Sequence, residues 1–195
     1  MNINILLFDD FETLDAFGPA EVLGRVEQFS LHFISESGGL VKSRQGILVM
    51  TKPLVEADAS GVLLVPGGQG TRALVKNKAF LKNLSTAASL SSYCLTVCTG
   101  SALLAATGLL DGVRATSNKK AFDWVVSVSE NVQWVPRARW AVDGKFYTSS
   151  GVSAGIDMSL GFVADMFGIE KAENLAYDIE YIWNRDRECD PFARV

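Results

Sequence analysis

The 195 residues suffice for one sizeable hydrophobic core and are few for two ordinary domains, so we expect a single domain over residues 1–195. With 48% hydrophobic and 21% charged residues, the composition is that of a folded α/β protein, and no apolar run reaches the roughly 18 residues of a membrane span. A net charge of -4, and three cysteines without C-x-x-C spacing, disfavour nucleic-acid binding, a disulfide framework and a zinc site.

The N-terminal segment predicts a buried strand followed by a helix. The apolar run from Asn2 to Phe8 ends in two aspartates and has no basic leader, which favours a first strand over a signal peptide. We therefore expect a cytoplasmic protein. Pro19 stands near the first turn of an apolar-periodic helix, where proline is tolerated. Asp15 is thus predicted at or just before the helix N-terminus, where the common role of an aspartate is to cap the helix.

Strands separated by glycine-rich turns are predicted next. Ser30 to Ser35 is a strand that holds His32, the single histidine, and Val41 to Lys52 forms two short strands. The following apolar run, V-L-L-V, is continuous, which indicates burial on both faces of a parallel sheet. It ends in P-G-G-Q-G, which lacks both the Lys-Ser/Thr of a phosphate loop and G-x-G-x-x-G spacing. We therefore do not expect a bound nucleotide.

The second half of the chain continues the alternation. The predicted helices are Asn77–Ser91, Ser101–Thr107, Lys119–Val128, a long buried helix after Ser149, and Lys171–Trp183. The predicted strands are the run that ends at Cys98, Val113–Thr116, and a hairpin of Arg139–Val142 with Lys145–Ser149. Strands alternating with helices indicate a doubly wound, mainly parallel sheet with helices on both faces.

The segment around Cys98 is the strongest candidate for a reactive site. The sequence Y-C-L-T-V-C-T-G-S predicts a buried strand that turns sharply into a helix, which is the geometry of a nucleophile elbow. The positive end of a helix favours the thiolate, so we predict a lowered pKa for the Cys98 thiol. The alternative is that Cys98 is a small buried hydrophobe, the common state of a free cysteine.

Three loops are predicted to meet at this point, because doubly wound sheets bind ligands beyond the carboxyl ends of their strands. The loops are Asp9–Pro19, Pro66–Gly70 and Cys98–Ser101. If they converge, the Cys98 thiol faces the Asp15 carboxylate and two sets of backbone N–H donors. Such a site allows covalent catalysis without a histidine.

Four motifs stand in order along the chain: L-L-F-D-D-F-E-T-L-D-A-F-G-P-A-E-V-L, V-P-G-G-Q-G, V-C-T-G-S-A-L-L-A-A-T-G-L-L-D-G-V-R-A-T-S and T-S-S-G-V-S-A-G-I-D-M-S-L. Together they resemble the ThiJ/PfpI family, part of the class I glutamine-amidotransferase-like superfamily, from about Asn2 to the region of Glu170. An aspartate in L-D-x-x-G-P, followed by V-C-T-G-S, is similar to the isonitrile hydratase-like branch.

The resemblance implies a flavodoxin-like fold, a homodimer and a small-molecule substrate. It implies that Cys98 is a nucleophile, with Asp15 beside it as acid and base and Thr99 contributing its backbone N–H. It also implies that Gly67, Gly68 and Gly100 line the substrate or oxyanion position. No metal or other cofactor is implied.

The chain departs from several members of that family. Thr99 follows the cysteine where family peptidases and amidases have a histidine, and the His-Glu pair of glutamine amidotransferases is missing. Asn118 stands at or near the histidine of other branches. We therefore predict a lyase, neither a protease nor a glutamine amidotransferase, that adds water to an isonitrile or similar small electrophile to give an N-substituted formamide. The alternatives are a non-enzymatic redox or electrophile sensor that uses Cys98 and, ranked last, a ligand-binding regulatory domain.

Other residues receive structural predictions. Cys94 is expected to be buried and inert, and Asp157 to cap the long helix. The four tryptophans are expected in core or dimer contacts and not in a substrate pocket: Trp124, Trp134, Trp140 and Trp183.

Overall fold

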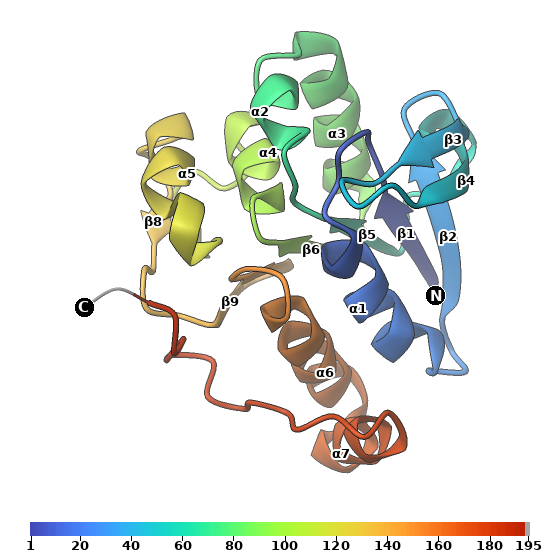
Figure 1. Ribbon diagram of the computed structural model, residues 1–195, viewed down its shortest axis with the longest axis vertical. Coiled ribbons are helices and arrows are strands. Elements are labelled where there is room, and N and C mark those ends of the chain that lie inside the picture. Colours follow the sequence, from blue (N-terminus) through green and yellow to red (C-terminus); the bar gives the residue numbers. More distant parts are fainter. Residues whose placement is uncertain (194–195) are drawn as a thin grey trace.

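A central sheet of eight strands organises the computed structural model, which describes residues 1–193 (Figure 1). The strand order is β3-β4-β2-β1-β5-β6-β10-β9. The six inner strands run parallel, while β3 and β9 are antiparallel edges. The strands are β1 Asn2–Leu6, β2 Ser30–Ser35, β3 Gly39–Lys42, β4 Leu48–Pro53, β5 Val62–Val65, β6 Tyr93–Val97, β9 Trp140–Asp143 and β10 Phe146–Ser149. A small second sheet pairs β7 (Arg114–Ala115) with β8 (Gln133–Trp134).

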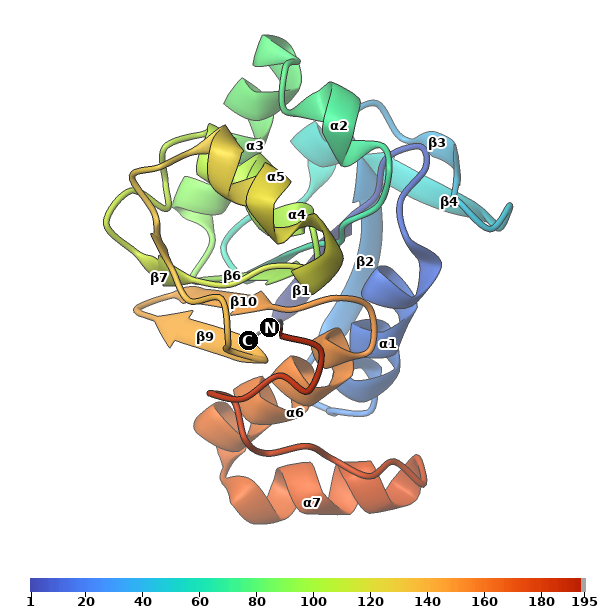
Figure 2. The same cartoon turned by 60° about the vertical axis from the view of Figure 1, so that its left-hand side comes forward.

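Helices cover both faces of the large sheet, as the two views show (Figures 1 and 2). One layer holds α2 (Thr71–Leu74), α3 (Lys78–Leu90), α4 (Gly100–Ala106) and α5 (Phe122–Val128). The other holds α1 (Thr13–Gly24) and α6 (Ala154–Phe167), with α7 (Ile169–Asp178) packed outside α6. The structure thus has the flavodoxin-like, doubly wound architecture that the sequence predicts. No helix within residues 1–193 is long and apolar enough to cross a bilayer.

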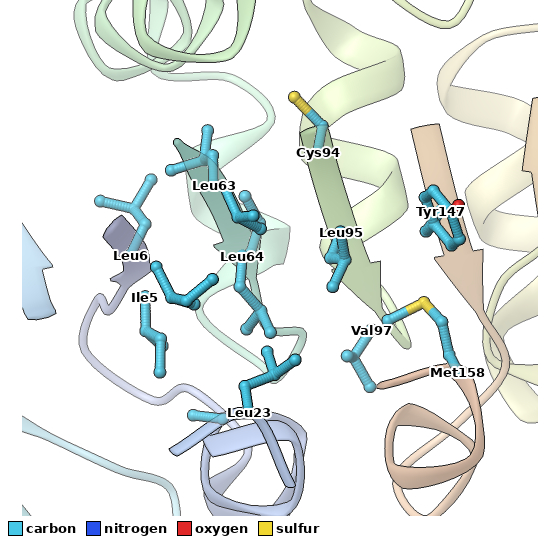
Figure 3. Packing of buried hydrophobic residues seen from close by; sticks show 14 of the residues in the cluster. Ile5, Leu6, Leu23, Leu63, Leu64, Cys94, Leu95, Val97, Tyr147 and Met158 are labelled. Atoms are coloured by element: carbon cyan, nitrogen blue, oxygen red, sulfur yellow. The ribbon is translucent and has the colours of Figure 1, made fainter. Parts of the chain in front are cut away.

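The core follows from strands that are apolar on both faces. All four residues of β5 are buried, as expected for an inner parallel strand. In Figure 3, Met158 of α6 packs beside Val97 on one face of the sheet, whereas the Cys94 side chain points to the opposite face. Cys94 is buried, and burial raises the pKa of its thiol to about 11, in agreement with the expected inert role.

Helix α1 begins earlier than predicted. It starts at Thr13, so Pro19 is its seventh residue and lies inside the helix, not in the first turn. The Glu12 N–H donates a 2.8 Å hydrogen bond to the Gly67 carbonyl, which anchors the start of the helix against the loop after β5. Propensity alone does not reveal this long-range contact.

The start of α5 and the end of α7 also differ from prediction. The segment predicted as one helix over Lys119–Val128 is a 3₁₀ turn, Lys119–Ala121, followed by α5. The last helix, predicted over Lys171–Trp183, ends at Asp178, and Glu180 follows with a positive φ of 51°. Beyond it the chain turns back over α6 (Figure 2).

Asp157 holds this returning segment in place and does not cap α6. One carboxylate oxygen accepts a hydrogen bond of 2.6 Å from Nε of Arg139, and both side chains are buried. The other oxygen accepts from the Tyr181 hydroxyl at 3.1 Å and from the Asn184 N–H at 3.0 Å. The cap prediction is therefore wrong, because a buried cation and two donors distant in sequence engage the carboxylate.

Candidate active site

Cys98 lies at the turn between β6 and α4. Its φ is 57°, in the left-handed region that non-glycine residues rarely adopt. Its N–H donates to the carbonyls of Ser149 and Ser150, at 3.2 and 3.0 Å, which holds the strained turn against the end of β10. The next turn needs Gly100, since a Cβ there would lie 2.2 Å from the Val65 carbonyl oxygen. The elbow predicted from the sequence is present.

Asp15 sits in the first turn of α1 with no exposed surface. Its Oδ2 accepts a 2.9 Å hydrogen bond from the Gly67 N–H, which belongs to the loop after β5 and not to α1. Its buried Oδ1 accepts no hydrogen bond of good geometry, although the Cys98 thiol and the Val152 N–H lie near enough to lower the pKa of the carboxyl. The carboxyl group lies close enough to Cys98 for each to alter the other's pKa. The alternative that Asp15 merely caps the helix is excluded, because Glu12 holds the N-cap position and the Asp15 carboxyl accepts from the loop after β5.

Burial sets the acidity of both groups. It raises the pKa of Asp15 to about 7, and the charge of Glu12 adds to this while the Gly67 N–H opposes it. Burial, and then the negative charge of Asp15, raise the pKa of the Cys98 thiol, while the Thr99 N–H and the Asn118 side chain lower it. The predicted lowering of the thiol pKa is therefore wrong: the dipole of a helix as short as α4 is outweighed by desolvation.

The glycine loop after β5 supports Asp15 and Thr99. A Cβ on Gly67 would lie 2.6 Å from the Thr99 nitrogen and Oγ1, and 2.9 Å from Asp15 Oδ2. The Gly68 N–H donates to Thr99 Oγ1 at 3.1 Å, and the Thr71 hydroxyl lies 3.2 Å from that same oxygen. Thus the N–H groups of Gly67 and Gly68 already have protein acceptors, and only glycine permits this close approach.

A cavity of about 490 Å³ opens in front of the elbow, and we call it the Cys98 cavity. Its lining includes Cys98, Thr99 and Gly68. Asp15 is buried and is not part of this lining. Sequence reasoning missed several of its residues: Glu12, Arg44, Arg72, Lys120, Trp124 and Val152. Trp124 was expected in the core or at an interface, and α5 instead brings it to the cavity. Of these residues, Arg72 alone could have been predicted near the site from the sequence, because it closely follows the glycine loop.

Asn118 lines both the Cys98 cavity and a second cavity of about 440 Å³. Lys120 and Val152 also line both, and Phe192 from the C-terminal segment lines the second. Within residues 1–193, no group of three or more His, Cys, Asp or Glu side chains is arranged to hold a metal ion.

Comparison with known proteins places this elbow in a family. The DJ-1/PfpI family pattern matches residues 1–165, which contain Asp15, the glycine loop and Cys98. The chain belongs to the DJ-1/PfpI family. An isonitrile hydratase of Pseudomonas putida is 31% identical over 93% of this chain and 78% of its own length. The HTH-type transcriptional regulator CdhR of Pseudomonas aeruginosa is 30% identical over 82% of this chain and 48% of its own length.

Solved structures of the DJ-1/PfpI family share the fold. A ThiJ/PfpI family protein of Pseudomonas syringae superposes with a TM-score of 0.84 at 28% identity, over 92% of this chain and 74% of that one. Drosophila melanogaster DJ-1beta superposes with a TM-score of 0.79 over 93% of this chain and 98% of that one, at 20% identity. The ThiJ/PfpI resemblance noted in the sequence is confirmed.

Proposed function

We propose that this DJ-1/PfpI protein is a lyase that adds water to an isonitrile, R–N≡C, to give an N-substituted formamide, R–NH–CHO. The observation that carries the proposal is a fully buried Asp15 carboxyl, with one oxygen lacking a donor, beside the Cys98 thiol. The identity of 31% to an isonitrile hydratase over most of both chains supports the same chemistry.

The pair would act with one shared proton. Two buried acids in contact titrate together, and here the first proton leaves near pH 7 while burial and like charge retain the second. The singly protonated pair includes the form in which Cys98 is a thiolate and Asp15 a neutral acid. In that form the Asp15 oxygen without a donor carries the proton. The Thr99 N–H and the Asn118 side chain favour the thiolate.

In the first step the thiolate attacks the terminal carbon of the isonitrile, and the Asp15 proton moves to that carbon. The product is a thioformimidate, Cys98–S–CH=N–R, with Asp15 ionised. Water from the cavity then adds its hydroxyl to the carbon and a proton to the nitrogen, assisted by the Asp15 carboxylate. Finally the carbon–sulfur bond breaks, the electron pair returns to sulfur, and the hydroxyl proton goes to Asp15. The formamide leaves and the starting pair is restored.

Gly67, Gly68 and Thr99 would serve this chemistry mainly by position. Because the N–H groups of both glycines bind protein oxygens, we assign them the placement of Asp15 and Thr99. The Thr99 N–H favours the thiolate more than the Asn118 side chain does, so it acts at the sulfur, where charge changes during the reaction. Gly100 allows α4 to begin close against β5.

Turnover of cyclohexyl isonitrile tests the proposal. We expect the wild-type protein to form N-cyclohexylformamide, and Cys98→Ala and Asp15→Asn each to abolish it. Cys94→Ala is the matched control and should retain turnover, because Cys94 is a buried cysteine on β6, the strand that leads to Cys98. Full activity in Cys98→Ala or Asp15→Asn would refute the mechanism. If no variant converts isonitrile and mild peroxide selectively oxidises Cys98, the sensor alternative is favoured.

We also propose that the protein works in the cytoplasm as a homodimer. The edge hairpin of β3 and β4 exposes Leu40, Leu48 and Met50, each with at least 60% of its surface accessible. An apolar patch on an edge strand is a surface that a second copy can cover.

The proposed cytoplasmic location is supported by the cysteines. All three are free thiols, which suits a reducing compartment.

A further inference from the structure

The Cys98 cavity carries more positive than negative charge. Three cationic side chains line it, Arg44, Arg72 and Lys120, against the single carboxylate of Glu12. Glu12 accepts a hydrogen bond from the Gln45 side-chain amide, a neutral partner, at 2.5 Å. Within the part of the chain that the structure describes, none of the three cations forms an ion pair. The proposed hydration of an isonitrile carbon gives no reason for this excess of cations.

Arg72 is the most constrained of the three. Its guanidinium carbon lies 3.3 Å from the centre of the Trp124 ring, so the planar group is stacked on the indole. One of its terminal nitrogens, Nη1, is buried and has no hydrogen-bond acceptor. A buried donor without an acceptor is costly, and a guanidinium fixed by stacking presents its N–H groups in one direction. Arg72 is therefore held in a fixed orientation at the wall of the Cys98 cavity, where an acceptor meets the part of the guanidinium that the cavity exposes and not the buried Nη1.

The position of Arg72 relates this acceptor to the reaction. Its charge interacts with Cys98, and both residues line the same cavity. A small molecule with its reactive carbon at the sulfur can therefore place a second group at the guanidinium. The two parallel N–H groups of a guanidinium match the two oxygens of a carboxylate. Arg44 and Lys120 are more exposed, so solvent and salt screen their charges and they add little to the binding of a carboxylate at Arg72.

We infer that the site takes isonitriles that bear a carboxylate, with the carboxylate bound by Arg72 and the isonitrile carbon at Cys98. This inference rests on the proposed hydration and specifies its substrate class. A competing role for Arg72 is to stabilise the Cys98 thiolate, which would accelerate neutral and anionic isonitriles alike. Comparison of the two kinds of substrate separates these roles.

Isocyanoacetate and its methyl ester form a matched pair that differs in the charge at the carboxyl end. We expect kcat/KM for the acid to exceed that for the ester by about tenfold or more, chiefly through KM. In Arg72→Met this ratio should fall to about one. Arg25→Met removes an arginine from an exposed pair with Glu21, remote from the cavity lining, and should leave the ratio unchanged. An unchanged ratio in Arg72→Met, whatever the absolute rates, would overturn the inference.

A binding measurement separates this inference from the proposed function. In Cys98→Ala, which cannot form the adduct, N-formylglycine should bind about tenfold more tightly than its methyl ester by calorimetry. The added change Arg72→Met should remove that difference. Equal binding of acid and ester would overturn the carboxylate site. By contrast, failure of the wild type to convert either isonitrile would refute the hydration, and conversion of both at equal kcat/KM would refute only the substrate class.

Discussion

Replacing Asp15 by asparagine keeps the shape of the side chain and removes its titration. Burial raises the pKa of Asp15 from 3.8 to about 7 in the folded protein. Between these values the folded chain holds a proton that the unfolded chain has lost, so wild-type stability falls as the pH rises. The shift is about three pKa units, each worth about 1.4 kcal/mol, and therefore costs the wild type about 4 kcal/mol above pH 7. Asp15→Asn lacks this loss.

Urea unfolding of both proteins at several values between pH 4 and pH 8 measures the effect. We expect the free energy of unfolding of Asp15→Asn minus that of the wild type to rise by about 4 kcal/mol over this range. Asp58→Asn is the control without a slope: the Ser60 N–H lowers the pKa of this exposed carboxyl, so its titration lies below this pH range and the difference from wild type should stay constant across it. A difference between wild type and Asp15→Asn that is constant with pH would show that Asp15 is not a buried, titrating acid.

Three further predictions concern the pair, the glycine loop and the dimer. The wild-type kcat/KM for an isonitrile should rise with pH through about 7 as the singly protonated pair forms, and a profile that is flat from pH 5 to pH 8 would contradict the shared proton. Gly67→Ala should lower turnover at least about tenfold and destabilise the fold by roughly 1–3 kcal/mol, since its methyl group would meet Thr99 and Asp15. Gly144→Ala meets nothing within 4 Å but strains a backbone with a φ of 55°, so it should cost stability and keep full turnover. Met50→Glu should yield monomers in light scattering, and Val55→Glu, exposed outside the hairpin, should not; a Met50→Glu protein that remains dimeric would exclude the hairpin as the interface.

Local sequence patterns predicted most of the fold. The continuous apolar run of β5 and the Asp-Gly turn between β9 and β10 each specify their element through short-range chemistry, and both are present. The errors arise where distant contacts decide. Helix α1 starts early because Glu12 binds the Gly67 carbonyl, and the last helix ends early in a segment that returns to Asp157. Neither partner is visible from neighbouring residues.

The site, too, was predicted where local chemistry decides and missed where distant contacts decide. The elbow at Cys98 and its meeting with Asp15 follow from the order of strands and loops in a doubly wound sheet. The acidity of the pair does not, because burial outweighs the helix dipole on which the sequence argument relied. Arg72 and Trp124 come from separate helices, and their stacking depends on how α2 and α5 pack over the elbow. Side-chain packing of this kind has no signature in residue spacing.

The proposed mechanism requires that Cys98 form a covalent bond to the isonitrile carbon and that Asp15 supply the proton. Rapid-quench mass spectrometry of the wild type during turnover detects this bond. We expect the peptide holding Cys98 to gain the mass of one isonitrile, this adduct to form and decay at rates consistent with formamide production, and Asp15→Asn to slow its formation. Steady formamide production with no adduct on Cys98, or production by Cys98→Ala at the wild-type rate, would refute this mechanism.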